Sequence, residues 1–350
     1  MNLSLENQVV LITGTAGFIG SWLAEHLLKT IKGIQVAGID NMNSYYDVTL
    51  KEKRLLRLKK YENFHFVKGD IAHKETVMEV FNRFKPAAVV NLAAQAGVRY
   101  SINHPDEYIE SNLIGFFHIL EACRHSFDAG GRGVAHFVYA SSSSVYGLGS
   151  EIPYSVEDKA DKPVSLYAAT KRADELMAYA YGKLYGIPST GLRFFTVYGP
   201  EGRPDMAYFS FTDRLAKGEK LQLFNYGDMY RDFTYIDDVV QGIEKVLGRP
   251  APPDEEGVPY KLYNIGNHHP ESLLTFVETL EKCLMEQGII KEPGEKEFLP
   301  MQPGDVYQTC ADVREMEEDF GFCPSTGLYE GLSRFAKWYA GFCEKGKGAC

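Results

Sequence analysis

The sequence has little of what a membrane protein or a nucleic-acid-binding protein requires. No basic segment followed by a long apolar run precedes the first predicted strand, so we expect neither a signal peptide nor a membrane anchor. The formal net charge is -10, which argues against nucleic acid or an anionic membrane as the partner. An anionic small molecule stays possible, because a local cluster of arginines can bind one inside an acidic protein.

Paired cysteines are also missing. None of the six forms a Cys-x-x-Cys pair or lies beside a histidine at metal-site spacing: Cys123, Cys283, Cys310, Cys323, Cys343 and Cys350. We therefore expect reduced thiols, no metal site and a cytoplasmic protein. The chain of 350 residues, 45% of them hydrophobic, is long enough for about two domains and a large buried core.

Short apolar runs alternate with helical patterns through the first half of the chain. The predicted strands cover 8–12, 34–39, 64–67, 88–92 and 136–140. The predicted helices cover 18–29, 49–60, 74–84 and 106–125. This alternation predicts an α/β fold with a doubly wound parallel Rossmann sheet and right-handed crossovers. The basic run at 49–60 is interpreted as a solvated helix face.

A glycine-rich turn follows the first predicted strand. Gly14, Gly17 and Gly20 are spaced Gly-x-x-Gly-x-x-Gly, and the helical pattern begins at Phe18 and Ile19. In a first βα unit such a turn lets the backbone approach a pyrophosphate at the helix N-terminus. We therefore predict a dinucleotide site here.

Acidic residues end the next two strands. Asp40 is placed to accept hydrogen bonds from a ribose 2′-OH and would repel a 2′-phosphate, which favours NAD over NADP. Asp70 is placed to contact the adenine. Their neighbours Asn41 and Ile71 are assigned to the same site.

Two further motifs carry catalytic chemistry. Four serines at 141–144 follow the fifth strand, at the carboxyl edge of a parallel sheet where ligands bind. Tyr167 and Lys171 are four residues apart and so share one helix face. A nearby ammonium stabilises a phenolate, so a tyrosine in this arrangement can act as a base near neutral pH.

Together these motifs resemble the extended short-chain dehydrogenases/reductases that act on nucleotide sugars, over nearly the whole chain. The family motifs are the glycine turn, 91–94 (NLAA, with Ala93 and Ala94 at the cofactor), the serine loop, Tyr-x-x-x-Lys and 231–236 (RDFTYI). Within the family the chain is most similar to UDP-glucuronate 4-epimerases, on 40–47, 94–101, 138–147, 163–172 and 192–206.

The resemblance implies an organisation as well as an activity. It implies bound NAD, a UDP-sugar substrate and a homodimer formed through helices at 106–125 and 165–184, while the charge and the N-terminal sequence predict no nucleic-acid or membrane partner. It also implies a smaller, discontinuous α/β substrate domain. The NAD-binding Rossmann domain is predicted at 1–193 with 233–265 returning to it, the nucleotide-sugar domain at 194–232 and 266–343, and a flexible tail at 344–350.

The family's catalytic roles fall on three residues. Tyr167 would remove the sugar 4-OH proton as hydride leaves C4 for NAD. Lys171 would assist Tyr167 and hold the nicotinamide ribose. Ser142 would hydrogen-bond the 4-oxygen.

The remaining substrate contacts also follow from the resemblance. Ser143 and Ser144 would line the pocket near C5 and C6, while Arg99 and Arg231 would contact the diphosphate. Arg203 would reach the diphosphate or clamp the uronate. The other contacts are Gln222 and Phe224 in the strand that pairs with uracil, Asp305 at the ribose, and Thr196, which stands where relatives often carry an asparagine.

The serine loop bears on which reaction follows. The 4-keto form of a glucuronate is a β-keto acid that readily loses carbon dioxide. Relatives that dehydrate carry Asp-Glu before Val-Tyr-Gly and decarboxylases carry Glu, whereas this chain carries Ser143 and Ser144. Hydroxyls hydrogen-bond a carboxylate without repelling it, so we expect 4-epimerisation of UDP-glucuronate to UDP-galacturonate.

Three alternatives stay open: a UDP-hexose 4-epimerase, a UDP-glucuronate decarboxylase, and a non-catalytic NAD-sensing Rossmann protein. The last would be expected to lack the Tyr-x-x-x-Lys pair. The sequence does not distinguish UDP from dTDP.

Overall fold

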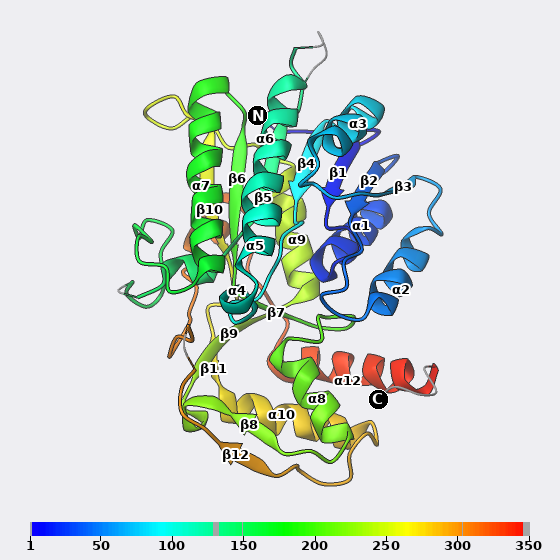
Figure 1. The fold of residues 1–350 in the computed structure, drawn as a ribbon, viewed down its shortest axis with the longest axis vertical. Helices are drawn as coiled ribbons and strands as arrows, with labels where there is room; N and C mark the ends of the chain where they lie inside the picture. The colour runs from blue at the N-terminus through cyan, green and yellow to red at the C-terminus, as the bar shows by residue number, and fades with distance from the viewer. Residues whose placement is uncertain (1, 129–132, 149, 303, 346–350) are drawn as a thin grey trace.

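A parallel seven-stranded sheet forms the centre of the molecule (Figure 1), for which a computed structural model describes residues 2–128, 133–148, 150–302 and 304–345. The strand order is β10-β6-β5-β4-β1-β2-β3. The strands are β1 (Val9–Thr13), β2 (Gln35–Asp40), β3 (Phe64–Lys68), β4 (Ala88–Asn91), β5 (His136–Ser142), β6 (Ser189–Phe194) and β10 (Tyr260–Ile265). The predicted doubly wound parallel sheet is confirmed.

Helices cover both faces of this sheet because its strands are apolar on both sides. In β1, Val10 and Ile12 pack into one hydrophobic cluster and Leu11 into another, since successive side chains point to opposite faces. The first cluster includes side chains of α1 (Phe18–Thr30), α2 (Val48–Leu58) and α9 (Ile236–Leu247). The second includes side chains of α3 (Lys74–Phe84), α6 (Gly115–His125) and α7 (Leu166–Tyr185).

The helix predicted at 106–125 is not uniform. Its segments are α5 (Pro105–Tyr108), a π-helical stretch η1 (Ile109–Ile114) and α6, and the short α4 (Tyr100–Asn103) precedes them. In the wide π turn the buried Asn112 accepts a hydrogen bond from the Gln95 N–H at 2.8 Å and donates one to Thr170 Oγ1 at 3.0 Å. A π turn inside a helix often marks a functional site, and this one lies against the helix that carries the tyrosine and lysine.

A smaller body lies at the carboxyl ends of the main strands (Figure 1). One sheet contains β7 (Thr196–Tyr198), β9 (Tyr230–Tyr235) and β11 (Pro270–Ser272), and a second pairs β8 (Leu221–Leu223) with β12 (Lys296–Phe298). Its helices include α8 (Ala207–Ala216), α10 (Leu273–Glu286) and α12 (Leu328–Lys345), and α11 (Arg314–Phe320) lies near β10. The domain boundaries stay a prediction. Of the tail placed at 344–350, α12 includes the first two residues and the rest lies outside the described part of the chain.

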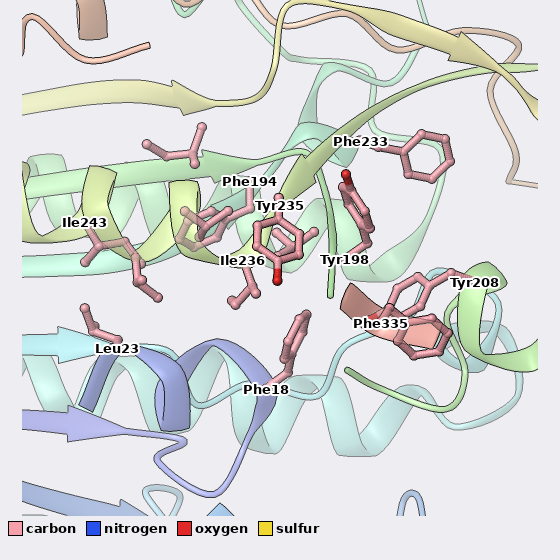
Figure 2. Close-up of a cluster of buried hydrophobic side chains, with 14 of the residues drawn as sticks. Phe18, Leu23, Phe194, Tyr198, Tyr208, Phe233, Tyr235, Ile236, Ile243 and Phe335 are labelled. Atoms are coloured by element: carbon pink, nitrogen blue, oxygen red, sulfur yellow. The ribbon is translucent and has the colours of Figure 1, made fainter. Parts of the chain in front are cut away.

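The two bodies share one apolar core (Figure 2). Phe18 and Ile236 come from helices of the main sheet, and Tyr198 and Phe335 from the smaller body. Within the smaller body, the rings of Tyr208 and Phe335 meet edge-on with centroids 4.9 Å apart, and both belong to the shared cluster. Separating the bodies would expose these apolar and aromatic side chains to water. The shared core therefore fixes the position of one body relative to the other.

Two expectations from composition are corrected. The basic run at 49–60 is not simply a solvated face, because Lys51 is 5% exposed and Arg54 0% exposed on α2. The expectation of reduced thiols holds for Cys123, Cys283, Cys310 and Cys323 but is wrong for Cys343, which is disulfide-bonded. Sequence spacing alone does not reveal which groups tertiary contacts bury or pair. None of the helices within the described ranges is long and apolar enough to cross a membrane.

Candidate active site

A cavity of about 1050 Å³ opens at the carboxyl ends of the main strands and continues into the smaller body. All of the residues that the sequence assigns to the cofactor and to the substrate line it. They come from stretches that are far apart in the chain, so the fold brings the predicted site together. Their individual roles stay predictions.

The glycine turn leaves no room for side chains. A Cβ at Gly14 would lie 2.9 Å from the Ala93 backbone nitrogen, and one at Gly20 would lie 2.3 Å from the Gly14 carbonyl oxygen. Gly14 also has a positive φ of +68°, which favours glycine. The turn therefore packs tightly on β4 and presents bare backbone at the start of α1, as a pyrophosphate cradle requires.

Acidic side chains are fixed at the ends of β2 and β3. Asp40 is buried and accepts hydrogen bonds from the N–H groups of Ala16, at 3.0 Å, and Met42, at 2.8 Å. Asp70 accepts one from Asn41 Nδ2 at 2.9 Å. The ribose-reading carboxylate predicted from the sequence is thus anchored to the glycine turn itself.

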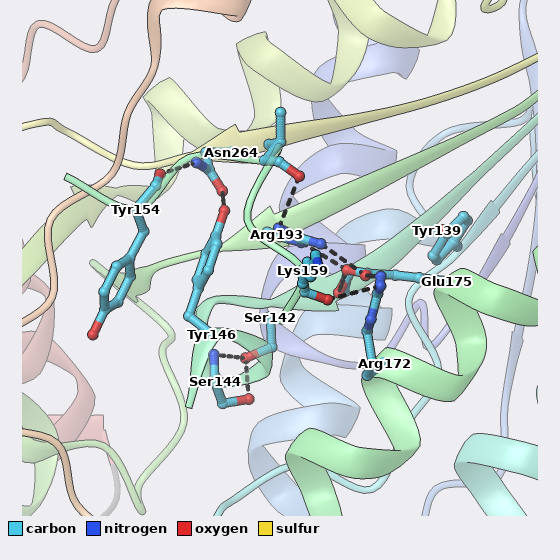
Figure 3. Close-up of polar contacts among 12 residues, drawn as sticks. Tyr139, Ser142, Ser144, Tyr146, Tyr154, Lys159, Arg172, Glu175, Arg193 and Asn264 are labelled. Carbon is cyan, nitrogen blue, oxygen red and sulfur yellow. Dashed lines mark hydrogen bonds and ion pairs between the residues drawn. The ribbon is translucent and has the colours of Figure 1, made fainter. Parts of the chain in front are cut away.

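The serine loop is ordered by its own hydroxyls (Figure 3). Ser142, at the end of β5, accepts hydrogen bonds from the Ser144 N–H at 3.2 Å and the Ser144 hydroxyl at 2.8 Å. Because the Ser142 oxygen accepts both of these hydrogen bonds, the Ser142 hydroxyl proton can donate a hydrogen bond to a ligand in the cavity. The short 3-10 helix η2 (Ser143–Tyr146) holds the remaining serines beside it.

Lys171 lies beneath the cavity on α7, one helical turn after Tyr167. It is 2% exposed, and its Nζ donates to the Ala140 carbonyl at 3.0 Å and to Asp174 Oδ2 at 3.2 Å. Burial raises the pKa of Asp174 to about 7, with Lys171 acting in the opposite direction. Two of the three ammonium donors are committed to the protein, and the third can serve a ligand.

A buried ionic network supports this end of the cavity (Figure 3). Glu175 accepts hydrogen bonds from Ser141 at 2.6 Å and from Arg193 at 2.8 and 2.9 Å. Although burial opposes ionisation, Arg193 and Ser141 hold the pKa of Glu175 below its ordinary value. The guanidinium of Arg193 lies over the ring of Tyr146, which follows the serines. Glu175 thus ties α7 to β5 and β6 directly under the serine loop.

Sequence reasoning missed Glu175, Asp174 and Asn112. Glu175 continues the helix face of Tyr167 and Lys171 by one more step of four, a spacing that could have identified it. Asn112 left no such signal, because other polar residues such as Glu110 and Ser111 precede it in the same helical run. Asp174 had no such signal, since a carboxylate three residues after a lysine is common on exposed helices.

Two of the predicted arginines gather at the far end of the cavity. Arg99 forms an ion pair with Asp305 at 2.7 Å, and its guanidinium lies over the ring of Phe224, 4.6 Å from the centroid. Arg231 donates to the carbonyls of Val306, at 2.7 Å, and Tyr307, at 3.1 Å. These cations and the segment 305–307 therefore form one polar rim.

Arg203 pairs with a different carboxylate. It forms a two-pronged ion pair with Asp205, at 3.1 and 3.0 Å, and interacts electrostatically with Tyr167 and Tyr45. Tyr45 in turn donates to Asp205 at 3.3 Å. Arg203 is thus tied through Asp205 to Tyr45.

The last two predicted contacts lie on strands of the smaller body. Thr196 begins β7 beside Phe233, and Gln222 in β8 donates to Glu297 of β12 at 3.1 Å. Both line the cavity.

Comparisons with known proteins cover nearly the full chain. The family described as GDP-mannose 4,6 dehydratase matches residues 11–335. Protein CapI of Staphylococcus aureus is 46% identical over 347 residues, 96% of this chain and 99% of that protein. A probable UDP-glucuronate 4-epimerase of Rhizobium meliloti is 41% identical, over 94% of this chain and 96% of its own length. The crystal structure of UDP-glucuronic acid 4-epimerase from Bacillus cereus, in complex with UDP-glucuronic acid and NAD, is similar with a TM-score of 0.84 and 32% identity, covering 95% and 99% of the two chains.

Proposed function

This chain belongs to the family described as GDP-mannose 4,6 dehydratase, and we propose that it is an NAD-dependent 4-epimerase that converts UDP-glucuronate to UDP-galacturonate. The relatives named UDP-glucuronate 4-epimerase and the similar structure that holds UDP-glucuronic acid and NAD support this activity. One observation carries it: the catalytic end combines Tyr167, Lys171 and Ser142 with serine hydroxyls and Arg203, where a carboxylate-removing relative would carry an acid.

The residues present fit the cofactor. The bare glycine turn at the start of α1 and the anchored Asp40 match a dinucleotide with a free ribose 2′-OH. When bound, NAD supplies a hydride acceptor for C4 and a donor for its return to the opposite face.

The protein's own groups move the proton. Tyr167 would take the 4-OH proton as base and return one after the ring has turned. Lys171, fixed by Ala140 and Asp174, would stabilise the phenolate and hold the nicotinamide ribose. Ser142 would donate its free proton to the 4-oxygen and orient it.

The carboxylate must be retained while C4 is oxidised. Arg203 interacts electrostatically with Tyr167, so we assign it to the uronate and not to the diphosphate. With Ser143 and Ser144 it would hold the carboxylate as an anion, and loss of carbon dioxide would have to give up these charge-assisted contacts.

The rim at the far end would hold the nucleotide. Arg99 and Arg231 would contact the diphosphate, with Thr196 beside it, and Asp305 would bind the ribose. The backbone from Leu221 to Phe224 would pair with uracil.

An exposed apolar surface supports a homodimer. Ile102, Ile109 and Phe117 on α4, η1 and α6, and Leu176 and Leu184 on α7, are all exposed. We propose that these helices pair with their copies in a second chain, in the cytoplasm. Light scattering should give twice the mass of 39.3 kDa, and Leu184→Asp should shift the protein toward monomer.

A proton NMR time course with UDP-glucuronate, without added NAD, tests the activity. Growth of a UDP-galacturonate anomeric signal to a stable mixture is the expected result. A pentose signal would instead mean decarboxylation. No change, followed by turnover of UDP-galactose in the same tube, would make the protein a hexose epimerase.

A further inference from the structure

Arg54 is a buried arginine of α2 that no step above uses. It is 0% exposed and lies in the basic run that the sequence presents as a solvated face. Its guanidinium makes five hydrogen bonds, which reach three separate segments of chain. These are the carbonyl of Ala16 at 2.9 Å, the hydroxyl of Tyr46 at 2.7 Å, the carbonyl of Glu201 at 2.5 and 3.2 Å, and the carbonyl of Gly202 at 3.2 Å.

The first of these segments is the cofactor turn. The N–H of Ala16 donates to Asp40 and its carbonyl accepts from Arg54, so this residue is held on both sides. Ala16 lies between Gly14 and Gly17. Arg54 therefore braces the turn that receives the pyrophosphate.

The segment at 200–202 runs directly into Arg203. Its three successive carbonyls all accept hydrogen bonds from helices of the main sheet, because Trp22 of α1 donates to Pro200 at 3.2 Å and Arg54 takes the next two. The backbone immediately before Arg203 is thus bonded to helices that pack on the main sheet. A planar guanidinium can bridge these oxygens in one geometry, which a lysine ammonium cannot copy.

We propose that Arg54 is a positioning residue that sets Arg203 against the substrate carboxylate by fixing residues 200–202 to the cofactor turn. The proposal rests on the proposed epimerase function. Through Arg203, Arg54 determines how often the oxidised sugar keeps its carboxylate. Its effect should therefore appear in the ratio of products, a quantity that does not depend on how much of the enzyme is folded.

The test is the pentose fraction formed per turnover from UDP-glucuronate, measured by NMR. Arg54→Lys should raise this fraction by about tenfold, since small misplacements of a positioned group have effects of this size or larger. Arg83→Lys is the control, because Arg83 is an exposed arginine of α3 whose guanidinium lies over the ring of its neighbour Phe84. The control should keep the wild-type product ratio.

A double variant decides whether Arg54 acts through Arg203. Arg203→Gln alone should raise the pentose fraction, and adding Arg54→Lys should change it no further. If the two substitutions multiply each other's effect on the pentose fraction, the proposal is overturned. A wild-type product ratio in Arg54→Lys would also overturn it. If Arg54→Lys does not fold, Trp22→Phe removes the bond to Pro200 while keeping an aromatic ring beside Arg57, and it should raise the fraction more modestly. An unchanged ratio there would also overturn the proposal. A wild-type enzyme that leaves UDP-glucuronate unchanged would contradict the proposed function itself, which separates the two failures.

Discussion

The two ends of the cavity are built in different ways. At the catalytic end, Lys171, Glu175 and Arg193 are buried, and their charges meet partners on α7, β5 and β6. At the nucleotide end, Arg99 has half of its side chain exposed, and it meets Asp305 across a loop. One end is fixed by regular structure before a ligand arrives, and the other consists of side chains that water already reaches.

This difference in burial matches the chemical task that we propose for each end. Proton and hydride transfer require atoms in place to fractions of an ångström, so buried and fully paired groups suit the catalytic end. A diphosphate offers several oxygens, so a half-exposed arginine such as Arg99, which can reorient, suits the nucleotide end. Substitutions should therefore act on rate and stability at one end, and on substrate affinity at the other.

The largest effect is expected at Tyr167. Tyr167→Phe removes the base and should lower kcat by about 10²- to 10⁴-fold, while NAD stays bound. Tyr179→Phe, on the same helix but with an exposed hydroxyl near Glu256, is the control and should turn over normally. A Tyr167→Phe enzyme with near wild-type turnover would remove this residue from the chemistry.

Glu175 tests whether the catalytic end is rigid through its ion pairs. Glu175→Ala leaves Arg193 buried without its carboxylate and should lower the free energy of unfolding by about 3–5 kcal/mol. The exposed pair of Arg334 and Glu330 provides the comparison, and Glu330→Ala should cost less than about 1 kcal/mol. Equal losses of unfolding free energy in urea titrations would mean that the buried ion pair stabilises the fold no more than the exposed pair.

Asp40 tests how the cofactor is selected. Asp40→Asn keeps an acceptor for Ala16 but removes the charge that would oppose a 2′-phosphate. The preference for NAD over NADP should fall by about tenfold to a hundredfold, the range of a charged hydrogen bond. Dissociation constants for both cofactors measure this, and an unchanged ratio would mean that another group reads the ribose.

Arg99 tests the exposed end. Arg99→Ala should raise KM for UDP-glucuronate by about tenfold and change the thermal stability little, because a half-exposed ion pair contributes little to folding. Lys220→Ala breaks a similar exposed pair with Glu295 away from the arginine rim and should leave KM unchanged. A fall in kcat with constant KM would place Arg99 at the chemistry instead.

The smallest effect is a pH dependence at Asp174. Its pKa is raised from 3.8 to about 7, mainly by burial, so between these values the folded protein binds a proton that the unfolded chain has released. Stability from this group is therefore present at low pH and is lost as the pH rises through about 7. Relative to wild type, Asp174→Asn should gain on the order of 1 kcal/mol between about pH 5 and pH 8 in denaturant titrations. Parallel profiles of unfolding free energy against pH for the variant and the wild type would contradict this prediction.

Local patterns in the sequence predicted the elements well. Apolar runs located the five N-terminal strands, and the glycine turn located the start of α1, because buried strands and phosphate-binding turns leave short-range signals. The π turn at Asn112 left no short-range signal in the sequence, because it depends on contacts of Asn112 with Gln95 and Thr170, which are far away in the chain.

The sequence by itself determined the chemistry available: a glycine turn, Tyr167 with Lys171, and serines where an acid would favour loss of carbon dioxide. Spacing along one helix or one strand end suffices for that. Only the tertiary structure decided where the cations act. It buried Arg54 against Ala16 and Gly202, and it paired Arg203 with Asp205 and Arg99 with Asp305. A charge has no fixed environment until long-range packing chooses its neighbours, and no spacing in the chain encodes that choice.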